Sequence, residues 1–145
     1  MSKFTKADLI NSLIGEQDTV KITKTEGVDM FVSDILTSRN QSHVFHLQTK
    51  SYAEHKALGS YYEGIGDLID GFVESYQGKY GIIGSFDCEG IENYSSSEQV
   101  ISYFKGLADN IEISRKEIKD SYLQNQVDTI LELIYSTLYK LKYLS

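Results

Sequence analysis

Two histidines and two carboxylates, His43, His55, Asp70 and Glu74, follow one another at intervals of 12, 15 and 4 residues. Imidazole nitrogen and carboxylate oxygen together suit first-row divalent metals such as iron, manganese and zinc. The stretch that carries them has the pattern of two helices joined by a short turn, and a helix pair is a rigid frame for such ligands. The spacing therefore predicts a metal site on a helical bundle.

The composition predicts a single helical domain. The chain has 145 residues and no proline, and a domain of this size buries roughly 68% of the surface that its unfolded chain exposes. Its apolar residues recur at intervals of three and four, which is the period of an α-helix. Cys88 is the one cysteine, so an internal disulfide is excluded and a reducing compartment is favoured. We therefore expect a cytoplasmic, all-α protein.

Charge and hydropathy argue against two classes of partner. The net charge at pH 7 is −7, whereas proteins that grip the phosphate backbone of DNA need clustered Lys and Arg. The two ends of the chain carry only Lys3, Lys6, Lys140 and Lys142, too few for a basic tail. No apolar run approaches the roughly 20 residues that cross a bilayer, and the N-terminus lacks the apolar core of a signal peptide. Neither DNA nor a membrane is expected as a partner.

The helical pattern divides the domain into an N-terminal part, residues 1–27, and a four-helix bundle, residues 28–145. The N-terminal part is expected to hold a short helix over Lys6–Ile14, followed by a loop. Ser51 with Glu54 is the capping-box signature of a helix start, so the turn before it is very short and its helices are antiparallel. The longest connection, residues 78–96, is expected to contain a short helical turn. The bundle helices are predicted over Val28–Thr49, Tyr52–Gln77, Ser97–Ile118 and Asn125–Tyr143.

A helical wheel of the second bundle helix separates the core from the carboxylates. With His55 at zero, the core residues gather at about 260–300°, whereas Asp70 and Glu74 fall at about 60° and 100°. Gly59 and Gly66 form a flat strip at about 20–40°. Each glycine costs a helix roughly 1 kcal/mol relative to alanine, so the strip is expected to have a compensating role. We interpret this strip as a contact between subunits. The comparison uses Leu58, Ile65 and Phe72 from a predicted core stripe that comprises His55, Leu58, Tyr62, Ile65, Ile69, Phe72 and Tyr76.

The segment HVFHLQTKSYAEHKALGSYYEGIGDLIDGFVESYQG resembles the first two bundle helices of the Dps branch of the ferritin-like superfamily. The last helix, NQVDTILELIYSTLYKLKYL, is similar to that family's C-terminal helix. The resemblance implies a ferritin-like four-helix bundle with iron ligands at His43, His55, Asp70 and Glu74. It also implies that histidines of one subunit meet carboxylates of another, that Fe(II) is oxidised by peroxide or oxygen, and that subunits assemble as dimers or as a dodecameric shell.

Two departures from the family leave alternatives open. The family has His-Trp before a glycine-containing turn, whereas this chain has His46-Leu47 before a serine turn and no tryptophan. His46 is therefore an alternative to His43 as the ligand. The blocks HLQTKSYAEHKAL and ESYQGKYG also resemble small, functionally uncharacterised tailed-phage proteins. That resemblance implies a phage origin, a host cytoplasm, and an alternative function as a non-catalytic bundle that engages a host or virion component.

Simpler interpretations compete with the metal site. Glu63, Asp67, Asp70 and Glu74 recur at helical spacing, which is typical of a solvated helix face. A zinc or manganese ion that only joins subunits is an alternative to iron. Ordinary di-iron bundles carry two Glu-x-x-His pairs. This chain lacks them, which argues against a di-iron core within one subunit. The row Tyr135, Tyr139 and Tyr143 could donate electrons to iron, although packing is the commoner role.

Overall fold

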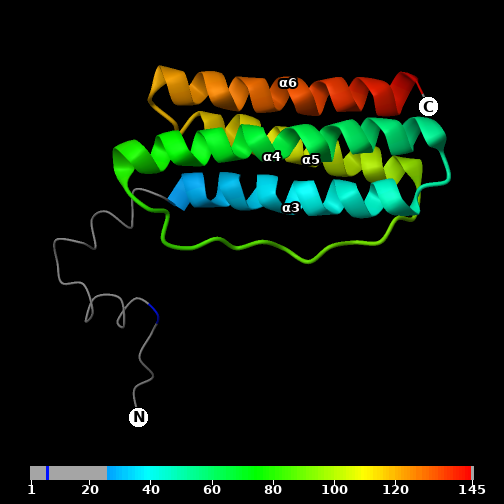
Figure 1. The fold of residues 1–145 in the computed structure, drawn as a ribbon, viewed down its shortest axis with the longest axis horizontal. Helices are drawn as coiled ribbons and strands as arrows, with labels where there is room; N and C mark the ends of the chain where they lie inside the picture. The colour runs from blue at the N-terminus through cyan, green and yellow to red at the C-terminus, as the bar shows by residue number, and fades with distance from the viewer. Residues whose placement is uncertain (1–5, 7–25, 145) are drawn as a thin grey trace, which may run out of the picture.

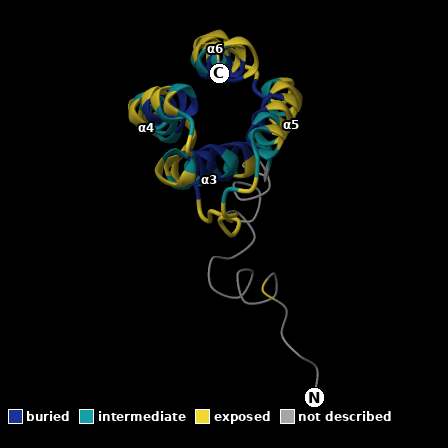
Figure 2. Ribbon diagram, turned by 90° about the vertical axis from the view of Figure 1, so that its right-hand side faces the viewer, coloured by how far each residue is buried: buried dark blue, intermediate teal, exposed yellow. Residues whose placement is uncertain are grey.

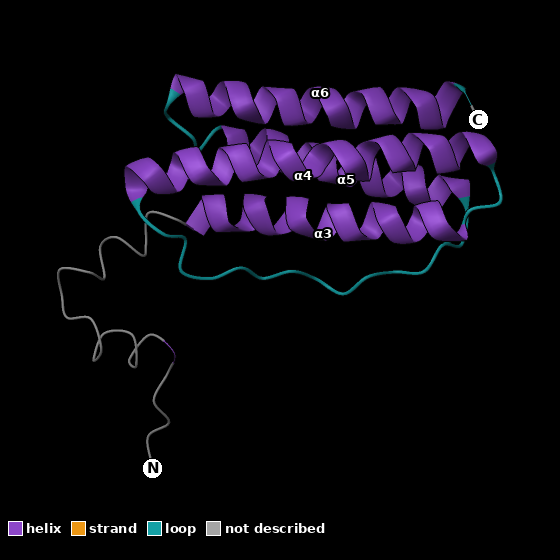
Figure 3. Cartoon of the chain, in the orientation of Figure 1, coloured by secondary structure: helices purple, strands orange, loops and turns teal. Residues whose placement is uncertain are grey.

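The structure is a computed structural model that describes Lys6 and residues 26–144. Apart from Lys6, the predicted N-terminal helix Lys6–Ile14 lies outside the described residues. The described chain contains four helices and no strand, which confirms the all-α four-helix bundle (Figures 1 and 3). No described helix combines the length and the hydropathy that crossing a bilayer requires. The helices are α3 Glu26–Gln48, α4 Tyr52–Tyr80, α5 Ser97–Arg115 and α6 Ser121–Tyr143.

The four helices form a closed ring around one core. Helix α3 packs against α4, α4 against α6, α6 against α5, and α5 against α3. Viewed along the bundle in Figure 2, the buried faces of all four helices point to the centre. Two helical hairpins, α3–α4 and α5–α6, are joined by residues 81–96, which run back along α3 (Figure 1). All neighbouring helices are therefore antiparallel.

Five of the seven residues predicted to form the core stripe of α4 are buried, whereas His55 and Tyr62 are half-buried. Leu58, Ile65 and Phe72 are fully buried, as the wheel indicated. The predicted stripe included Tyr62, but Tyr61 is the fully buried tyrosine, and its hydroxyl lies 2.6 Å from Ser38 Oγ on α3. Burial raises the pKa of Tyr61, so its hydroxyl stays neutral inside the bundle. The stripe is wider than predicted because α4 packs on both α3 and α6.

Several helix boundaries differ from those predicted from the sequence. Ser51 caps α4 as predicted, because its Oγ accepts a hydrogen bond from the Glu54 amide. The predicted stop at Gly78 is wrong: α4 continues to Tyr80 and ends at Gly81, whose φ of 96° favours glycine. Helix α6 begins at Ser121, one turn earlier than predicted, and α3 begins at Glu26. The expected helical turn within 78–96 is absent from residues 81–96.

Side chains of α3 fasten the long connection to the bundle. The Gln41 amide donates to the Glu92 carbonyl at 2.9 Å and accepts from the Glu92 amide at 2.8 Å. About two helical turns away on either side, Gln48 accepts from the Tyr94 amide and Ser33 accepts from the Asp87 amide. These bonds satisfy backbone groups that no helix or strand pairs. The connection is therefore extended, without helical structure of its own.

Candidate functional site

The imidazoles of His46 and His55 pair across the short turn between α3 and α4. Nδ1 of His46 lies 2.7 Å from the carbonyl oxygen of His55, and Nδ1 of His55 lies 2.9 Å from the carbonyl oxygen of His46. The two rings stack with their centroids 3.7 Å apart and their planes 19° from parallel. Each histidine is thus held both by the stack and by a hydrogen bond to the backbone of the other.

The pairing determines which ring nitrogens are left for a ligand. A carbonyl oxygen only accepts hydrogen bonds, so both Nδ1 atoms carry the proton. In the neutral ring, Nε2 then keeps its lone pair, which is the arrangement that metal-binding histidines usually show. Both side chains are half-buried. The pair is therefore oriented and chemically suited to coordinate a divalent cation.

His43 lies beside this pair but has a different partner. Its ring stacks on Tyr62 with centroids 4.2 Å apart, and its centroid is 6.1 Å from that of His46. The side chain is exposed. Of the two candidates left open by the sequence, His46 is the one that contacts His55, while His43 extends the imidazole surface along α3.

The two glycines of the predicted subunit contact lie beneath side chains of α3. A Cβ at residue 59 would be 3.1 Å from Cε1 of His46, and one at residue 66 would be 3.4 Å from Nε of Arg39. Glycine at residue 59 therefore has a reason within the chain, because it makes room for the His46 ring, whereas a Cβ at residue 66 would make only ordinary contact with the Arg39 guanidinium. The contact between subunits at Gly59 and Gly66 stays a prediction.

The candidate carboxylates lie further along α4. Asp70 and Glu74 are exposed, and Asp70 is about 22 Å from His55 along the helix axis, at 1.5 Å per residue. The part of the chain that the structure describes has no group of three His, Cys, Asp or Glu side chains that could hold a metal ion. One chain therefore does not bring the predicted ligands together. It presents imidazoles and carboxylates at separate places on one face.

The α4 stripe that carries these carboxylates is polar. Glu63 and Asp67 are exposed like Asp70 and Glu74, in keeping with a solvated helix face. At the amino-terminal end of the same stripe, Lys56 is exposed as well. The outward face of α4 therefore has a cationic and imidazole end and an anionic end.

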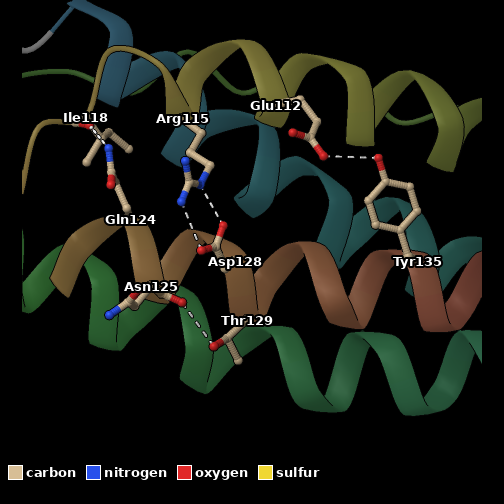
Figure 4. Close-up of polar contacts among 8 residues, drawn as sticks. All are labelled: Glu112, Arg115, Ile118, Gln124, Asn125, Asp128, Thr129 and Tyr135. Carbon is tan, nitrogen blue, oxygen red and sulfur yellow. Dashed lines mark hydrogen bonds and ion pairs between the residues drawn. The ribbon is translucent and has the colours of Figure 1, made fainter. Parts of the chain in front are cut away.

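The tyrosine row of α6 lies on the opposite side of the bundle from α3. Tyr135, Tyr139 and Tyr143 are all exposed, and the Tyr135 hydroxyl donates to Glu112 of α5 at 3.3 Å (Figure 4). Partial burial, and then the negative charge of Glu112, raise the pKa of Tyr135. Because α3 and α6 are diagonal in the ring (Figure 2), this row lies away from the imidazole pair.

One polar cluster was missed by the sequence reasoning. Glu54 is 1% exposed, and its carboxylate accepts hydrogen bonds from Thr49 Oγ1 at 2.6 Å and from the Tyr94 hydroxyl at 2.7 Å. The capping-box spacing gave a signal for its position but not for these partners, which come from the turn and from the long connection. The cluster ties three segments together beside the imidazole pair. Cys88, by contrast, is exposed.

Comparison with known proteins places the chain in a family. A model described as a family of unknown function (DUF5856) matches residues 46–141. The chain belongs to this family. The matched region begins at His46 and includes His55, Asp70 and Glu74.

A phage protein shares part of the sequence. Over 58 residues the chain is 36% identical to an uncharacterised 14.6 kDa protein from the mobD-ri intergenic region of Enterobacteria phage T4. The match covers 40% of this chain and 45% of that protein. The predicted similarity to small phage proteins is confirmed. No solved structure matches the chain.

Proposed function

We propose that the protein binds divalent metal ions between two copies of the chain, through imidazoles of one copy and carboxylates of the other. The observation that carries the proposal is the His46–His55 pair, in which both Nδ1 atoms are bound to backbone carbonyls. Such hydrogen bonds fix the tautomer and the orientation of each ring. The rings are thus held ready for an ion before it arrives.

A second copy completes the site. In a pair related by a twofold axis, each surface contacts the same surface of its partner. An axis that crosses antiparallel α4 helices near Glu63 sets the imidazole end of each chain against the anionic end of the other, because Glu63 lies about midway between His55 and Asp70. The pairing creates two equivalent sites. In each, the carboxylates of Asp70 and Glu74 offset the charge of the ion.

Iron is the substrate that the Dps-like resemblance favours. Two Fe(II) ions give one electron each to one molecule of hydrogen peroxide, which takes up two protons and becomes two molecules of water. The imidazoles and carboxylates would hold the ions during this reaction. The long connection between two helical hairpins is also found in ferritin-like bundles. Storage of the oxidised iron would further require a closed shell of subunits.

Metal uptake by matched variants tests the proposal. Metal-free protein is titrated calorimetrically with Fe(II) without oxygen, and oxidation by added peroxide is then followed by absorbance. Asp70→Ala with Glu74→Ala is expected to abolish uptake and oxidation. Glu63→Ala with Asp67→Ala removes the same charge from the same stripe and is expected to preserve both. Equal uptake by the two double variants, or none by the unaltered chain, would refute the proposal.

Two other outcomes have their own meaning. Uptake of Zn(II) with assembly but no oxidation of Fe(II) would indicate a metal that only joins subunits. A binding protein of the phage, without catalysis, is the second candidate function. It is favoured by the similarity to a phage protein and by large apolar side chains left exposed at one end of the bundle, of which Tyr52 and Tyr143 are 75% and 72% exposed.

A further inference from the structure

A groove opens between the first two turns of α4 and the last turn of α6. It has a volume of about 390 Å³, near the lower end of the range for ligand pockets. Ala53, Ala57 and Leu144 contribute apolar surface to its lining, and Tyr52 lines it as well. The groove lies at the end of the bundle where the C-terminus is marked in Figure 1. Its size suits one large apolar side chain.

Two lysines line the groove beside this apolar surface. Lys56 comes from α4 and Lys140 from α6. Within the described residues, the ion pairs are Lys79–Asp120 and Arg115–Asp128, so neither groove lysine has a carboxylate partner there. Lys140 lies in the last turn of α6, where the helix dipole favours a cation, whereas Lys56 is near the amino-terminal end of α4, where it does not. The helix dipole therefore does not account for Lys56, whose Nζ lies 5.9 Å from the centroid of the Tyr52 ring at the same groove.

Two more lysines lie at the same end of the bundle, outside the groove. Lys50 lies in the turn between α3 and α4, and Lys142 lies in the last turn of α6. The carboxylate of Glu54, close to this turn, is buried and already bound by Thr49 and Tyr94. This end of the bundle therefore carries four lysines, two of which line the groove, against the exposed carboxylate of Glu98 in the first turn of α5, in a chain whose net charge is −7.

We propose that this groove binds an acidic segment of a partner protein, with an apolar or aromatic side chain of the segment seated between Tyr52, Ala57 and Leu144. Carboxylates on either side of that anchor would contact Lys56 and Lys140. Apolar burial would supply most of the affinity, and the two lysines, of which Lys56 is exposed and Lys140 half-buried, would add orientation and a faster encounter.

Charge and shape favour this occupant over two others. A nucleic acid needs more clustered cations than four lysines and is repelled by the net negative charge of the chain. A second copy could offer the carboxylates of α4, from Glu63 to Glu74. Between Tyr52 and Tyr80, however, the α4 face has no large apolar side chain that is exposed, so this face of a second copy lacks an anchor for the groove. A second copy that docked through another segment would be detected as self-association.

Selection from a random peptide library tests the proposal. The immobilised full-length protein is expected to enrich peptides in which Asp or Glu flank one large apolar residue. Affinity of an enriched peptide is then measured by fluorescence anisotropy. Lys56→Glu with Lys140→Glu is expected to weaken binding about tenfold or more, and added salt should weaken it as well. Lys116→Glu, at an exposed lysine just after the end of α5, is the control for a charge reversal outside the groove.

Each other result would overturn the proposal. Enrichment without acidic residues, or an equal loss with Lys116→Glu, would show that the groove lysines do not select the ligand. Tighter binding of a single-stranded oligonucleotide than of any peptide would assign the surface to nucleic acid. Self-association of the metal-free protein that is lost in the double lysine variant would assign the groove to a second copy. Circular dichroism of every variant excludes unfolding as the cause of a loss.

Discussion

Alanine substitutions at Gly59 and Gly66 are expected to change the stability in opposite directions. At an open helix position, alanine is more favourable than glycine by about 1 kcal/mol. A Cβ at residue 66 would lie 3.4 Å from Nε of Arg39, and Arg39 is an exposed side chain that can shift by a few tenths of an ångström. Gly66→Ala should therefore raise the free energy of unfolding by about 1 kcal/mol.

In Gly59→Ala, the new Cβ contacts a side chain that cannot shift freely. The new Cβ would lie 3.1 Å from Cε1 and 3.2 Å from Nδ1 of His46. The His46 ring is stacked on His55 and bound to its carbonyl, so displacement breaks the reciprocal pair. Two lost hydrogen bonds of about 1 kcal/mol each outweigh the gain in helix propensity, and the net result is a loss of about 1 kcal/mol.

Urea unfolding of the two variants and the unaltered chain measures both changes. The expected difference between Gly66→Ala and Gly59→Ala is about 2 kcal/mol. Nitrogen-15 NMR of the imidazoles adds an independent readout, because the signals of the Nδ1-protonated tautomer of His46 and His55 should lose intensity only in Gly59→Ala. If Gly59→Ala is as stable as Gly66→Ala and keeps the same tautomers, the reciprocal pair does not hold the rings as described.

Three further predictions follow from single contacts. Gln41→Ala removes both bonds to the Glu92 backbone, so hydrogen exchange should show faster exchange of the Glu92 amide and a loss of about 1–2 kcal/mol of local stability. Ile65→Ala, at a fully buried position, should cost roughly 3 kcal/mol in urea unfolding. The hydrogen bond and charge of Arg115 lower the pKa of Asp128, so this carboxylate stabilises the fold above its unfolded pKa of about 3.9 and loses that effect as the pH falls through the lower folded pKa. In thermal unfolding between about pH 2 and 5, Asp128→Asn should therefore show a shallower decrease of Tm than the unaltered chain, and an identical decrease would contradict the role of the Arg115 bond.

Local patterns were sufficient to predict the four helices. Helical periodicity located their cores, and the Ser51 cap located the turn between α3 and α4. The ends were harder, because they depend on single backbone angles and distant contacts. Gly78 and Gly81 look alike in the sequence, yet only Gly81 has a positive φ. The extended form of residues 81–96 depends on Gln41, Gln48 and Ser33 of α3, which no local pattern connects with that segment.

The sequence predicted only those relations in the candidate site that lie within one helix. The wheel of α4 placed His55, Gly59 and Gly66 near one another, and this arrangement depends on helix geometry alone. The position of His46 over Gly59 depends on how α3 is rotated against α4. The exchange of hydrogen bonds between His46 and His55 likewise depends on the shape of the turn. Whether Asp70 and Glu74 join these imidazoles depends on a second chain.

Native mass spectrometry of the metal-free protein during titration with Fe(II) or Zn(II) tests the central claim most directly. It reports the number of chains and the number of bound ions in one spectrum. We expect dimers or larger even-numbered assemblies that carry metal, and we expect monomers without metal when Asp70 and Glu74 are both replaced by alanine. A protein that stays monomeric, or that binds the ion as a single chain with those carboxylates removed, would contradict an intersubunit metal site.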